Sequence, residues 1–244
     1  MNHRLHTLFV AAMLASGLAH AGPVSLLTNG NFESGLSGWS VTSTNAIGGG
    51  CDTAWNVGAS GAAAGCTGYA PYNSFVGPQS GTRAAYAALD GNGPQTVRLA
   101  QTFSYVGGTV VNATLNWWDA VGLGAGWSQP QPRSLSVDVT IDGHLNNVFT
   151  EAYANAGAGL FQNWQQTTLD LTSLFAASGA GTHTVTLGFN DNVPQSFTGP
   201  GVIALDNVQL LLTNQVPEPQ SLALAGLGLL CAGLVRRRKT TQAS

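Results

Sequence analysis

Three stretches of the chain alternate between apolar and polar residues. Their apolar members are Val111, Ala113, Leu115 and Trp117 in VNATLNWWD, Leu135, Val137, Val139 and Ile141 in RSLSVDVTID, and Val185, Leu187 and Phe189 in HTVTLGFN. Successive side chains of a β-strand point to opposite faces, so each stretch predicts a strand with one buried and one solvated face. Patterns with a helical period are scarce.

The segments between these strands are rich in glycine, asparagine and proline, which favours tight turns. Asp142-Gly143 predicts a hairpin turn, and residues 171–178 predict one short helical turn. The glycine-rich stretch from Thr42 to Pro78 shows no convincing strand. Short strands separated by turns predict an all-β fold, a jelly-roll β-sandwich that occupies residues 22–215.

The composition agrees with one domain and limits its partners. A chain of 244 residues, 44% of them apolar, is long enough for one sizeable core. Residues 22–215 carry three arginines, no lysine and ten acidic residues, which leaves this part of the chain near −7. An acidic surface repels phosphate backbones, so nucleic acid is not an expected partner.

The first 21 residues have the three parts of a secretory signal peptide. Arg4 supplies a positive start, residues 8–18 are mostly apolar, and Ala19-His20-Ala21 is a small-residue cleavage site. A buried N-terminal helix is the alternative, but it does not explain the order of these parts. We therefore expect the chain to be exported and cut before Gly22.

The residues from 216 to 240 hold a second targeting pattern. Leu222 to Val235 are all apolar or glycine, and four cations follow at positions 236–239. As a helix this run spans about 21 Å, somewhat less than a hydrocarbon core of about 30 Å. Because cations remain in the cytoplasm, we expect a single hydrophobic helix that anchors the chain transiently in the inner membrane, with the body outside. A core helix would leave the four cations unexplained.

The same segment resembles a PEP-CTERM sorting signal. The resemblance is carried by Pro217, Glu218 and Pro219, by the apolar run, and by Arg236, Arg237 and Arg238. It implies export in a Gram-negative bacterium that makes exopolysaccharide, and processing by exosortase, a membrane enzyme similar to transpeptidases. The sortase motif L-P-x-T-G is absent, and a GPI signal would lack the cationic end.

The body resembles galactose-binding-like jelly rolls, a group that includes many carbohydrate-binding modules. The resemblance rests on NGNFE at residues 29–33 with Gly38-Trp39, and on IALDNVQL at residues 203–210 in the place of the closing strand. It covers roughly residues 26–212. It implies a fold more strongly than it implies a ligand.

Such jelly rolls often hold a structural calcium ion between the first and last strands. The resemblance implies that the Asn31 carbonyl and the carboxylates of Glu33 and Asp206 supply its oxygen ligands. The alternative is that both carboxylates accept hydrogen bonds from the backbone of nearby turns.

Cys51 and Cys66 lie in the long glycine-rich stretch. In an oxidising compartment we expect them to form a disulfide, and closing this loop of about 15 residues contributes roughly 3 kcal/mol in the chain-entropy model. Without neighbouring histidines, two cysteines supply too few ligands for zinc.

The alternation also predicts a surface for sugars. Trp118 lies on the face opposite Trp117, beside Thr114 and Asn116, and an adjoining strand would add Asp138. An exposed indole suits the C–H face of a sugar ring, while amide, hydroxyl and carboxylate groups bind its hydroxyls. The alternative is that the 42–78 loop covers Trp118. Other aromatic platforms in the loops are Trp55, Tyr69, Tyr72 and Trp127.

Catalysis has little support in the sequence. The body has two histidines, His144 and His183, which we expect at the surface, and it lacks the motifs of serine hydrolases and zinc proteases. Asp138 and Glu151 leave glycan hydrolysis as an alternative. We predict a protein that is not an enzyme. It would bind polysaccharide at the cell surface or in the extracellular matrix of a biofilm, the other alternative being a structural protein that contacts other proteins.

Replacing Pro217, Glu218 and Pro219 by alanine should leave the tail uncut and hold the protein at the inner membrane. Cell fractionation and the intact mass of the released protein report this outcome. Release of the variant with the same mass as the wild type would show that the triplet is not a sorting signal.

Overall fold

The chain divides into two units, residues 23–212 and the two terminal segments 1–22 and 213–244. The computed structural model describes residues 22–45, 53–60, 77–89, 94–123, 133–153, 160–194 and 201–214. The predicted signal peptide, the disulfide between Cys51 and Cys66 and the sorting segment at 216–240 lie outside these ranges. Within them, no helix is long and apolar enough to cross a membrane.

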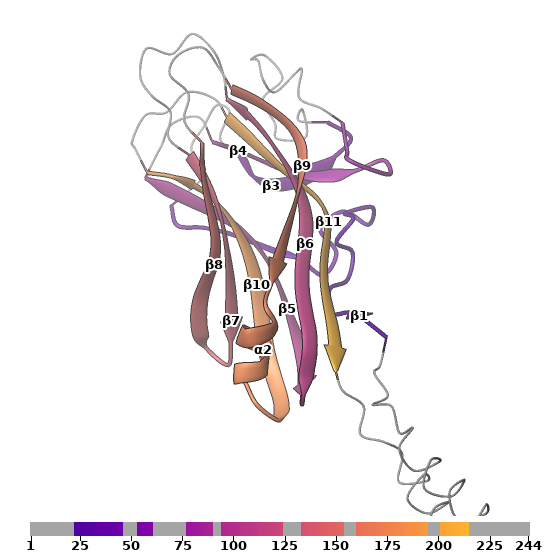
Figure 1. Ribbon diagram of the computed structural model, residues 1–244. Helices are drawn as coiled ribbons and strands as arrows, with labels where there is room; N and C mark the ends of the chain where they lie inside the picture. Colours follow the sequence, from indigo (N-terminus) through magenta and orange to yellow (C-terminus); the bar gives the residue numbers. More distant parts are fainter. Residues whose placement is uncertain are drawn as a thin grey trace, which may run out of the picture. The chain divides into compact units, whose positions relative to one another are not determined.

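Residues 23–212 form two antiparallel sheets packed face to face (Figure 1). The elements are β1 (Val24–Ser25), β2 (Ser40–Ser43), β3 (Thr53–Gly58), β4 (Ala84–Leu89), β5 (Gln95–Gly107), β6 (Val110–Leu123), β7 (Arg133–Ile141), β8 (His144–Tyr153), β9 (Leu160–Asp170), α2 (Thr172–Ala177), β10 (Gly181–Val193) and β11 (Gly201–Asn214). One sheet has the order β3-β4-β11-β6-β9, with β1 also paired to β11, and the other has the order β2-β5-β10-β7-β8. The predicted all-β jelly-roll sandwich is confirmed.

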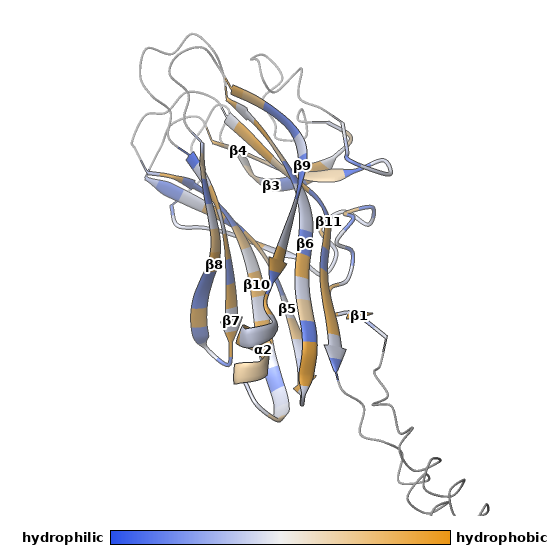
Figure 2. Ribbon diagram, viewed as in Figure 1, coloured by the Kyte–Doolittle hydropathy of each residue, from blue (hydrophilic) through white to orange (hydrophobic). Residues whose placement is uncertain are grey.

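The core lies between the sheets and follows the alternation of the sequence. Figure 2 shows hydrophobic and hydrophilic residues alternating along the long strands. The apolar residues expected to point inward in β7 and β10 are all buried, and so are Ala113, Leu115 and Trp117 in β6. Trp117 is fully buried, with its ring 5.0 Å from that of Phe149 and 5.5 Å from that of Phe189, edge to face in both pairs.

Two local predictions are confirmed, and one is wrong. The hairpin turn is confirmed, because Asp142 and Gly143 have φ angles of 49° and 85°, as a two-residue turn between β7 and β8 requires. The short helix is also confirmed as α2. Val111 was expected in the core but is 41% exposed. Val110 and Ala113 are buried, so the alternation of buried and exposed positions in β6 shifts by one residue between them.

The glycine-rich stretch after Thr42 contains a strand that the sequence did not reveal. Residues 53–58 form β3 at the edge of the six-stranded sheet, with an irregular register against β4 between Thr53 and Asn56. The interrupted pairing removes the regular alternation by which a strand is recognised. The prediction of no strand in this stretch is therefore wrong.

The two motifs that suggested a jelly roll lie against each other. Gly30 accepts a hydrogen bond of 2.9 Å from the Val208 N–H, and a Cβ at Gly30 would lie 1.9 Å from the Val208 carbonyl oxygen. Only glycine permits this close approach of two backbones. The Trp39 ring packs 5.5 Å from that of Phe32 and donates its indole N–H to the Asn29 carbonyl. The opening segment is thereby fixed to β11.

Candidate functional site

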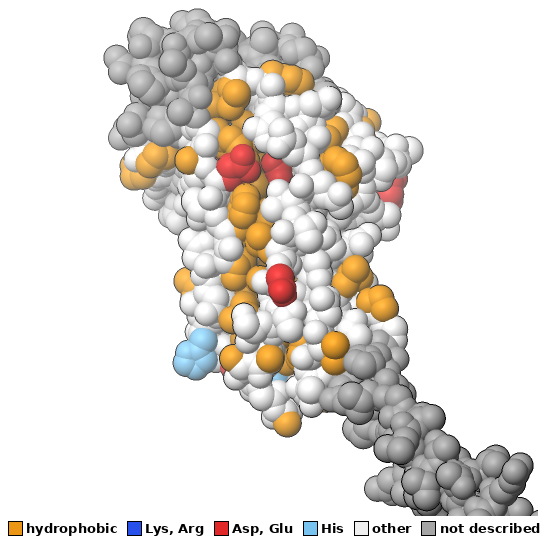
Figure 3. All heavy atoms as spheres, viewed as in Figure 1, with side chains coloured by type: hydrophobic (Ala, Val, Ile, Leu, Met, Phe, Trp, Pro, Cys, Tyr) orange, Lys and Arg blue, Asp and Glu red, His pale blue; other side chains and the backbone are white. Residues whose placement is uncertain are grey.

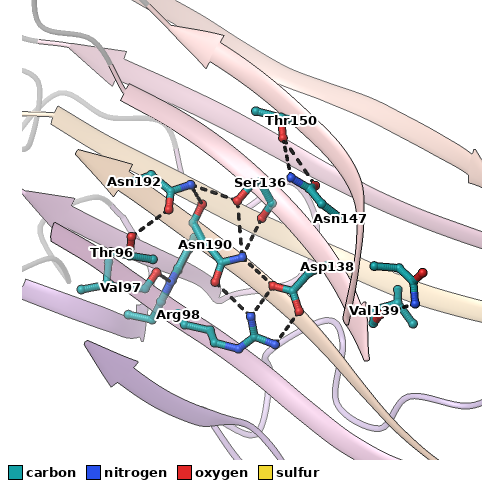
Figure 4. Close-up of polar contacts among 12 residues, drawn as sticks. Thr96, Val97, Arg98, Ser136, Asp138, Val139, Asn147, Thr150, Asn190 and Asn192 are labelled. Carbon is teal, nitrogen blue, oxygen red and sulfur yellow. Dashed lines mark hydrogen bonds and ion pairs between the residues drawn. The ribbon is translucent and has the colours of Figure 1, made fainter. Parts of the chain in front are cut away.

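The outer side of the five-stranded sheet carries a network of polar side chains, which we call the polar face (Figure 4). Arg98 forms a two-pronged ion pair with Asp138, in which Nη2 lies 2.7 Å from Oδ1 and Nη1 contacts Oδ2. Asn190 donates to Asp138 Oδ2 at 2.8 Å and accepts from Arg98 Nη1 at 3.2 Å. The only two charges in this network therefore neutralise each other.

Strand register explains why these groups meet. Arg98 on β5 lies opposite Asn190 on β10, which lies opposite Ser136 on β7, while Gly188 pairs with Asp138. The Arg98 guanidinium crosses directly over Gly188. A Cβ at Gly188 would lie 2.2 Å from the Cζ of Arg98. The absence of a side chain at Gly188 thus lets Arg98 reach the next strand but one.

Most groups of the polar face already have protein partners. Asn192 accepts from the Thr96 hydroxyl at 2.9 Å and donates to the Ser136 hydroxyl at 3.0 Å, and Thr102 bonds to Thr186 at 2.8 Å. Asp138 and Asn190 are only 7% and 8% exposed. A ligand on this face would have to replace existing hydrogen bonds, which reduces the net gain.

A second surface lies on the outer side of the six-stranded sheet at its edge, along β6 and β9. We call it the Trp face and define it by Thr114, Asn116, Trp118, Trp164, Gln166 and Thr168. Trp118 is opposite Gln166, and Asn116 is opposite Thr168, whose hydroxyl donates to the Asn116 Oδ1 at 2.8 Å. Both tryptophans are half-buried, and both Gln166 and Thr168 are exposed.

Trp164 was not singled out from the sequence, although it completes this surface. Its indole N–H donates to the Gly77 carbonyl at 2.8 Å, and its ring packs against a second small apolar cluster on the outer side of the sheet. That cluster consists of Ala84, Tyr86, Ala88, Ala120, Val202 and Ala204. The ring of Trp164 is therefore held in place by contacts on one side, while part of it remains accessible.

The structure separates the residues predicted to bind sugar. Thr114, Asn116 and Trp118 share the Trp face, but Asp138 lies on the polar face of the other sheet, and each face points away from the common core. Asp138 therefore does not adjoin Trp118. Trp55 is no platform, because it is 3% exposed and donates its N–H to the Val97 carbonyl at 3.1 Å in the core. Tyr69, Tyr72 and Trp127 lie outside the described residues, as do parts of the 42–78 loop.

The two carboxylates considered for glycan hydrolysis do not converge. Asp138 is on the outer side of its sheet, whereas Glu151 pairs with the buried Leu135 and lies on the inner side. Glu151 instead lies near Asp119 and Tyr153. This geometry provides no acid and base flanking one sugar bond at those two positions.

Asp119 is the centre of a polar cluster between the sheets. It is 1% exposed, accepts from the Trp117 indole at 2.9 Å and lies 3.4 Å from the Tyr153 hydroxyl, which donates to it. Burial, followed by the charge of Glu151, raises the pKa of Asp119 to about 6. Burial and the same two carboxylates raise the pKa of Tyr153, which therefore stays protonated.

The two carboxylates expected to bind calcium both reach the segment of residues 79–83. The Glu33 carboxylate accepts from the Thr82 N–H at 2.7 Å, from its hydroxyl at 2.6 Å and from the Arg83 N–H at 3.0 Å. Asp206 accepts from the N–H groups of Ser80 at 3.2 Å and Asn207 at 2.7 Å. The contacts match the alternative in which the carboxylates bind turn backbone.

The same place nevertheless has a chemistry that suits a hard cation. Asp206 is fully buried, and its pKa rises to about 6, mainly through burial and to a lesser extent through the charge of Glu33. A calcium ion held by Glu33, Asp206 and the Asn31 carbonyl would relieve this unfavourable charge. Within the described ranges, no three acidic, histidine or cysteine side chains form a metal cluster.

His183 is not the surface residue expected from the sequence. It is 8% exposed, its Nδ1 lies 2.7 Å from Asp142 Oδ2, and its ring stacks 5.3 Å from that of Tyr105. The hydrogen bond to Asp142 raises the pKa of His183 and lowers that of Asp142. The pair ties the β7–β8 turn to β10. His144 is exposed, as expected.

Comparison with known proteins identifies the tail. Residues 215–239 match the family model of the PEP-CTERM protein-sorting motif, so the chain carries the sorting signal of an exported protein. No curated protein matches the chain.

The body is similar in fold to several solved β-sandwich structures. One is the carbohydrate-binding module TmCBM61 in complex with β-1,4-galactotriose, with 14% identity, a TM-score of 0.43, and coverage of 77% of this chain and 97% of that one. Another is CBM27-1 of Caldicellulosiruptor saccharolyticus in complex with mannohexaose, with 15% identity, a TM-score of 0.44, and coverage of 78% and 96%. A third is the K3 cleaved adhesin domain of Lys-gingipain from Porphyromonas gingivalis, with 17% identity, a TM-score of 0.43, and coverage of 78% and 100%.

The buried carboxylates predict that the body is more stable in mild acid than at neutral pH. Asp119 and Asp206 have folded pKa values of about 6, above those of unfolded aspartate, so protonation favours the folded state. The raised pKa of His183 acts in the same direction. After allowance for solvent screening, we expect Asp119 and Asp206 together to raise the free energy of unfolding by about 1–3 kcal/mol from pH 8 to pH 5. Urea unfolding in excess chelator, so that no calcium ion holds Asp206 in its ionised form, measures this at a series of pH values.

Asp119→Asn should flatten this pH dependence, because it removes one of the titrating groups and keeps an acceptor for the Trp117 indole. Asp170→Asn is the matched control. Asp170 is exposed, and hydrogen bonds from Thr172 lower its pKa, so its protonation changes the stability only at a lower pH. If the free energy of unfolding of the wild type stayed constant or fell from pH 8 to pH 5, the raised pKa values of Asp119 and Asp206 would be contradicted.

Proposed function

We propose that this protein is exported, processed by exosortase at its PEP-CTERM tail, and placed at the cell surface or in the extracellular matrix, where its body binds polysaccharide without catalysing a reaction. The observation that supports binding is the Trp face. It combines two partly accessible indole rings with amide and hydroxyl groups on two adjacent strands. This combination is what recognition of a sugar chain requires.

The arrangement of the Trp face favours a chain over a single sugar. Trp118 of β6 is opposite Gln166 of β9, and Trp164 precedes Gln166 by two residues on β9. With a rise of about 3.3 Å per residue and about 4.8 Å between strands, the backbone positions that carry the two indoles are on the order of 8 Å apart. Two rings at such a separation provide stacking surfaces for different units of one polysaccharide.

The Trp face is preferred over the polar face because of its hydrogen bonding. On the polar face, Arg98, Asp138 and Asn190 are bound to one another. On the Trp face, Asn116 and Thr114 have only neutral partners, the Thr168 hydroxyl and the Asn112 amide, and the exposed Gln166 lies at the edge of the sheet. Groups that exchange water for sugar hydroxyls lose less than groups that must first give up protein partners.

Binding of the full chain, purified in mild detergent, to an array of polysaccharides tests this proposal. Trp118→Ala and Trp164→Ala should each weaken binding about tenfold, which corresponds to the loss of roughly 1.4 kcal/mol from one stacking contact. Trp118→Phe should retain much of the affinity, because a smaller aromatic plate remains.

Thr102→Ala on the polar face is the matched control and should leave the affinity unchanged. Loss of affinity in this variant, with normal binding by the tryptophan variants, would assign the site to the polar face. If no polysaccharide binds, the proposed function is wrong and a structural role in protein–protein contacts replaces it.

We also propose the calcium ion that the resemblance implies, held by Asn31, Glu33 and Asp206. What supports it is the burial of Asp206 beside a second carboxylate. Excess chelator should lower the melting temperature of the calcium-loaded protein by several degrees, since an ion bound only to the folded state stabilises it. Asp206→Asn should abolish the response. Equal melting temperatures with chelator and with calcium would exclude the site.

A further inference from the structure

We infer that the polysaccharide bound at the Trp face is uncharged, a conclusion that rests on the proposed function and adds its substrate class. Anionic polysaccharides, which carry carboxylate or sulfate groups, are recognised by accessible arginine and lysine side chains. The body has no lysine and three arginines, Arg83, Arg98 and Arg133.

Arg98 is bound on the polar face, away from the Trp face. Its guanidinium contacts both oxygens of Asp138, and 25% of its side chain is exposed. A polyanion would have to compete with a carboxylate that is already in two-pronged contact and almost buried. Such pairs are costly to open, because the displaced carboxylate would remain without its partner.

Arg133 lies inside the sandwich. It is 1% exposed, and its Nη2 donates a hydrogen bond to the Leu89 carbonyl. Its Nε would lie 2.3 Å from a Cβ built on Gly201, which shows how closely β11 covers it. A polysaccharide outside the sandwich cannot contact this guanidinium.

Arg83 is exposed, but it lies beside an anion. The backbone N–H of Arg83 donates to the Glu33 carboxylate at 3.0 Å, and the charge of its side chain is close enough to contribute to the lowered pKa of Glu33. The Glu33 carboxylate therefore offsets part of this positive charge. Of the two histidines, His183 is paired with Asp142 at the turn after β7, and the exposed His144 begins β8 in the other sheet.

An acidic residue lies beside the Trp face. Asp170 is opposite Thr114, is exposed, and has its pKa lowered by hydrogen bonds from Thr172, so it is ionised at neutral pH. Figure 3 shows acidic side chains among hydrophobic ones, and no arginine or lysine, on the described part of the face in view. With ten acidic residues against three arginines, the body repels anions as a whole.

Matched pairs of neutral and charged polysaccharides test the inference. The full chain in mild detergent is compared on hydroxyethylcellulose and carboxymethylcellulose, on dextran and dextran sulfate, and on galactan and polygalacturonate, together with the polysaccharides found on the array. We expect binding only to neutral members, with an affinity that changes less than about twofold between 20 and 500 mM NaCl, because no ion pair forms.

Asp170→Lys places a cation on the same side of β9 as the Trp face, opposite Thr114, and Asp170→Glu is the matched control. The lysine variant should gain severalfold in affinity for the charged member of a bound pair at low salt, while neutral binding stays the same in both variants. Salt-sensitive binding of a charged polysaccharide by the wild type, lost in Trp118→Ala, would overturn the inference and keep the proposed function. Absence of binding to every polysaccharide would overturn both.

Discussion

The packing of Trp117 between the two sheets is the contact on which the rest of the structure depends. This side chain of β6 meets Phe149 of β8 and Phe189 of β10, so it joins the six-stranded sheet to the five-stranded sheet. A buried aromatic of this size contributes several kcal/mol through apolar burial, and its position fixes the register of β6. Because neighbouring side chains of a strand alternate, a buried Trp117 places Trp118 outside. The proposed site is therefore a consequence of the core.

Polar side chains close the fold at places where apolar packing ends. Glu33 connects the opening segment to Thr82 and Arg83, and Asp142 connects the β7–β8 turn to His183. Each contact joins segments that are at least forty residues apart in the chain. These contacts use two carboxylates of a body that has few charged groups. The Trp face has aromatic, amide and hydroxyl groups as its means of recognition.

Much of the fold, but only part of the candidate site, could be predicted from the sequence. Leu135 to Ile141 and Val185 to Phe189 alternate without interruption, and their strands were correctly predicted. Val111 and β3 were not, because the pleat of β6 shifts near its start and the pairing of β3 with β4 is irregular.

The site depended on information that alternation does not contain. Alternation shows which side of a strand Asp138 occupies, but it does not show which sheet the strand joins. Alternation did not indicate Trp164, because β9 is an edge strand, partly exposed on both sides, and so has no clear apolar face. The partner of His183 comes from a turn 41 residues earlier, and no local pattern indicates such a pair.

The place of β11 has a consequence for folding after export. It is the last strand along the described chain, yet it lies at the centre of its sheet, between β4 and β6, and it also holds β1. Until β11 arrives, β4 and β6 have no common neighbour, and the opening segment has no Val208 to pack against. A chain that crosses a membrane from its N-terminus therefore completes this sheet only after nearly the whole body has emerged, when the sorting tail is the next segment to follow.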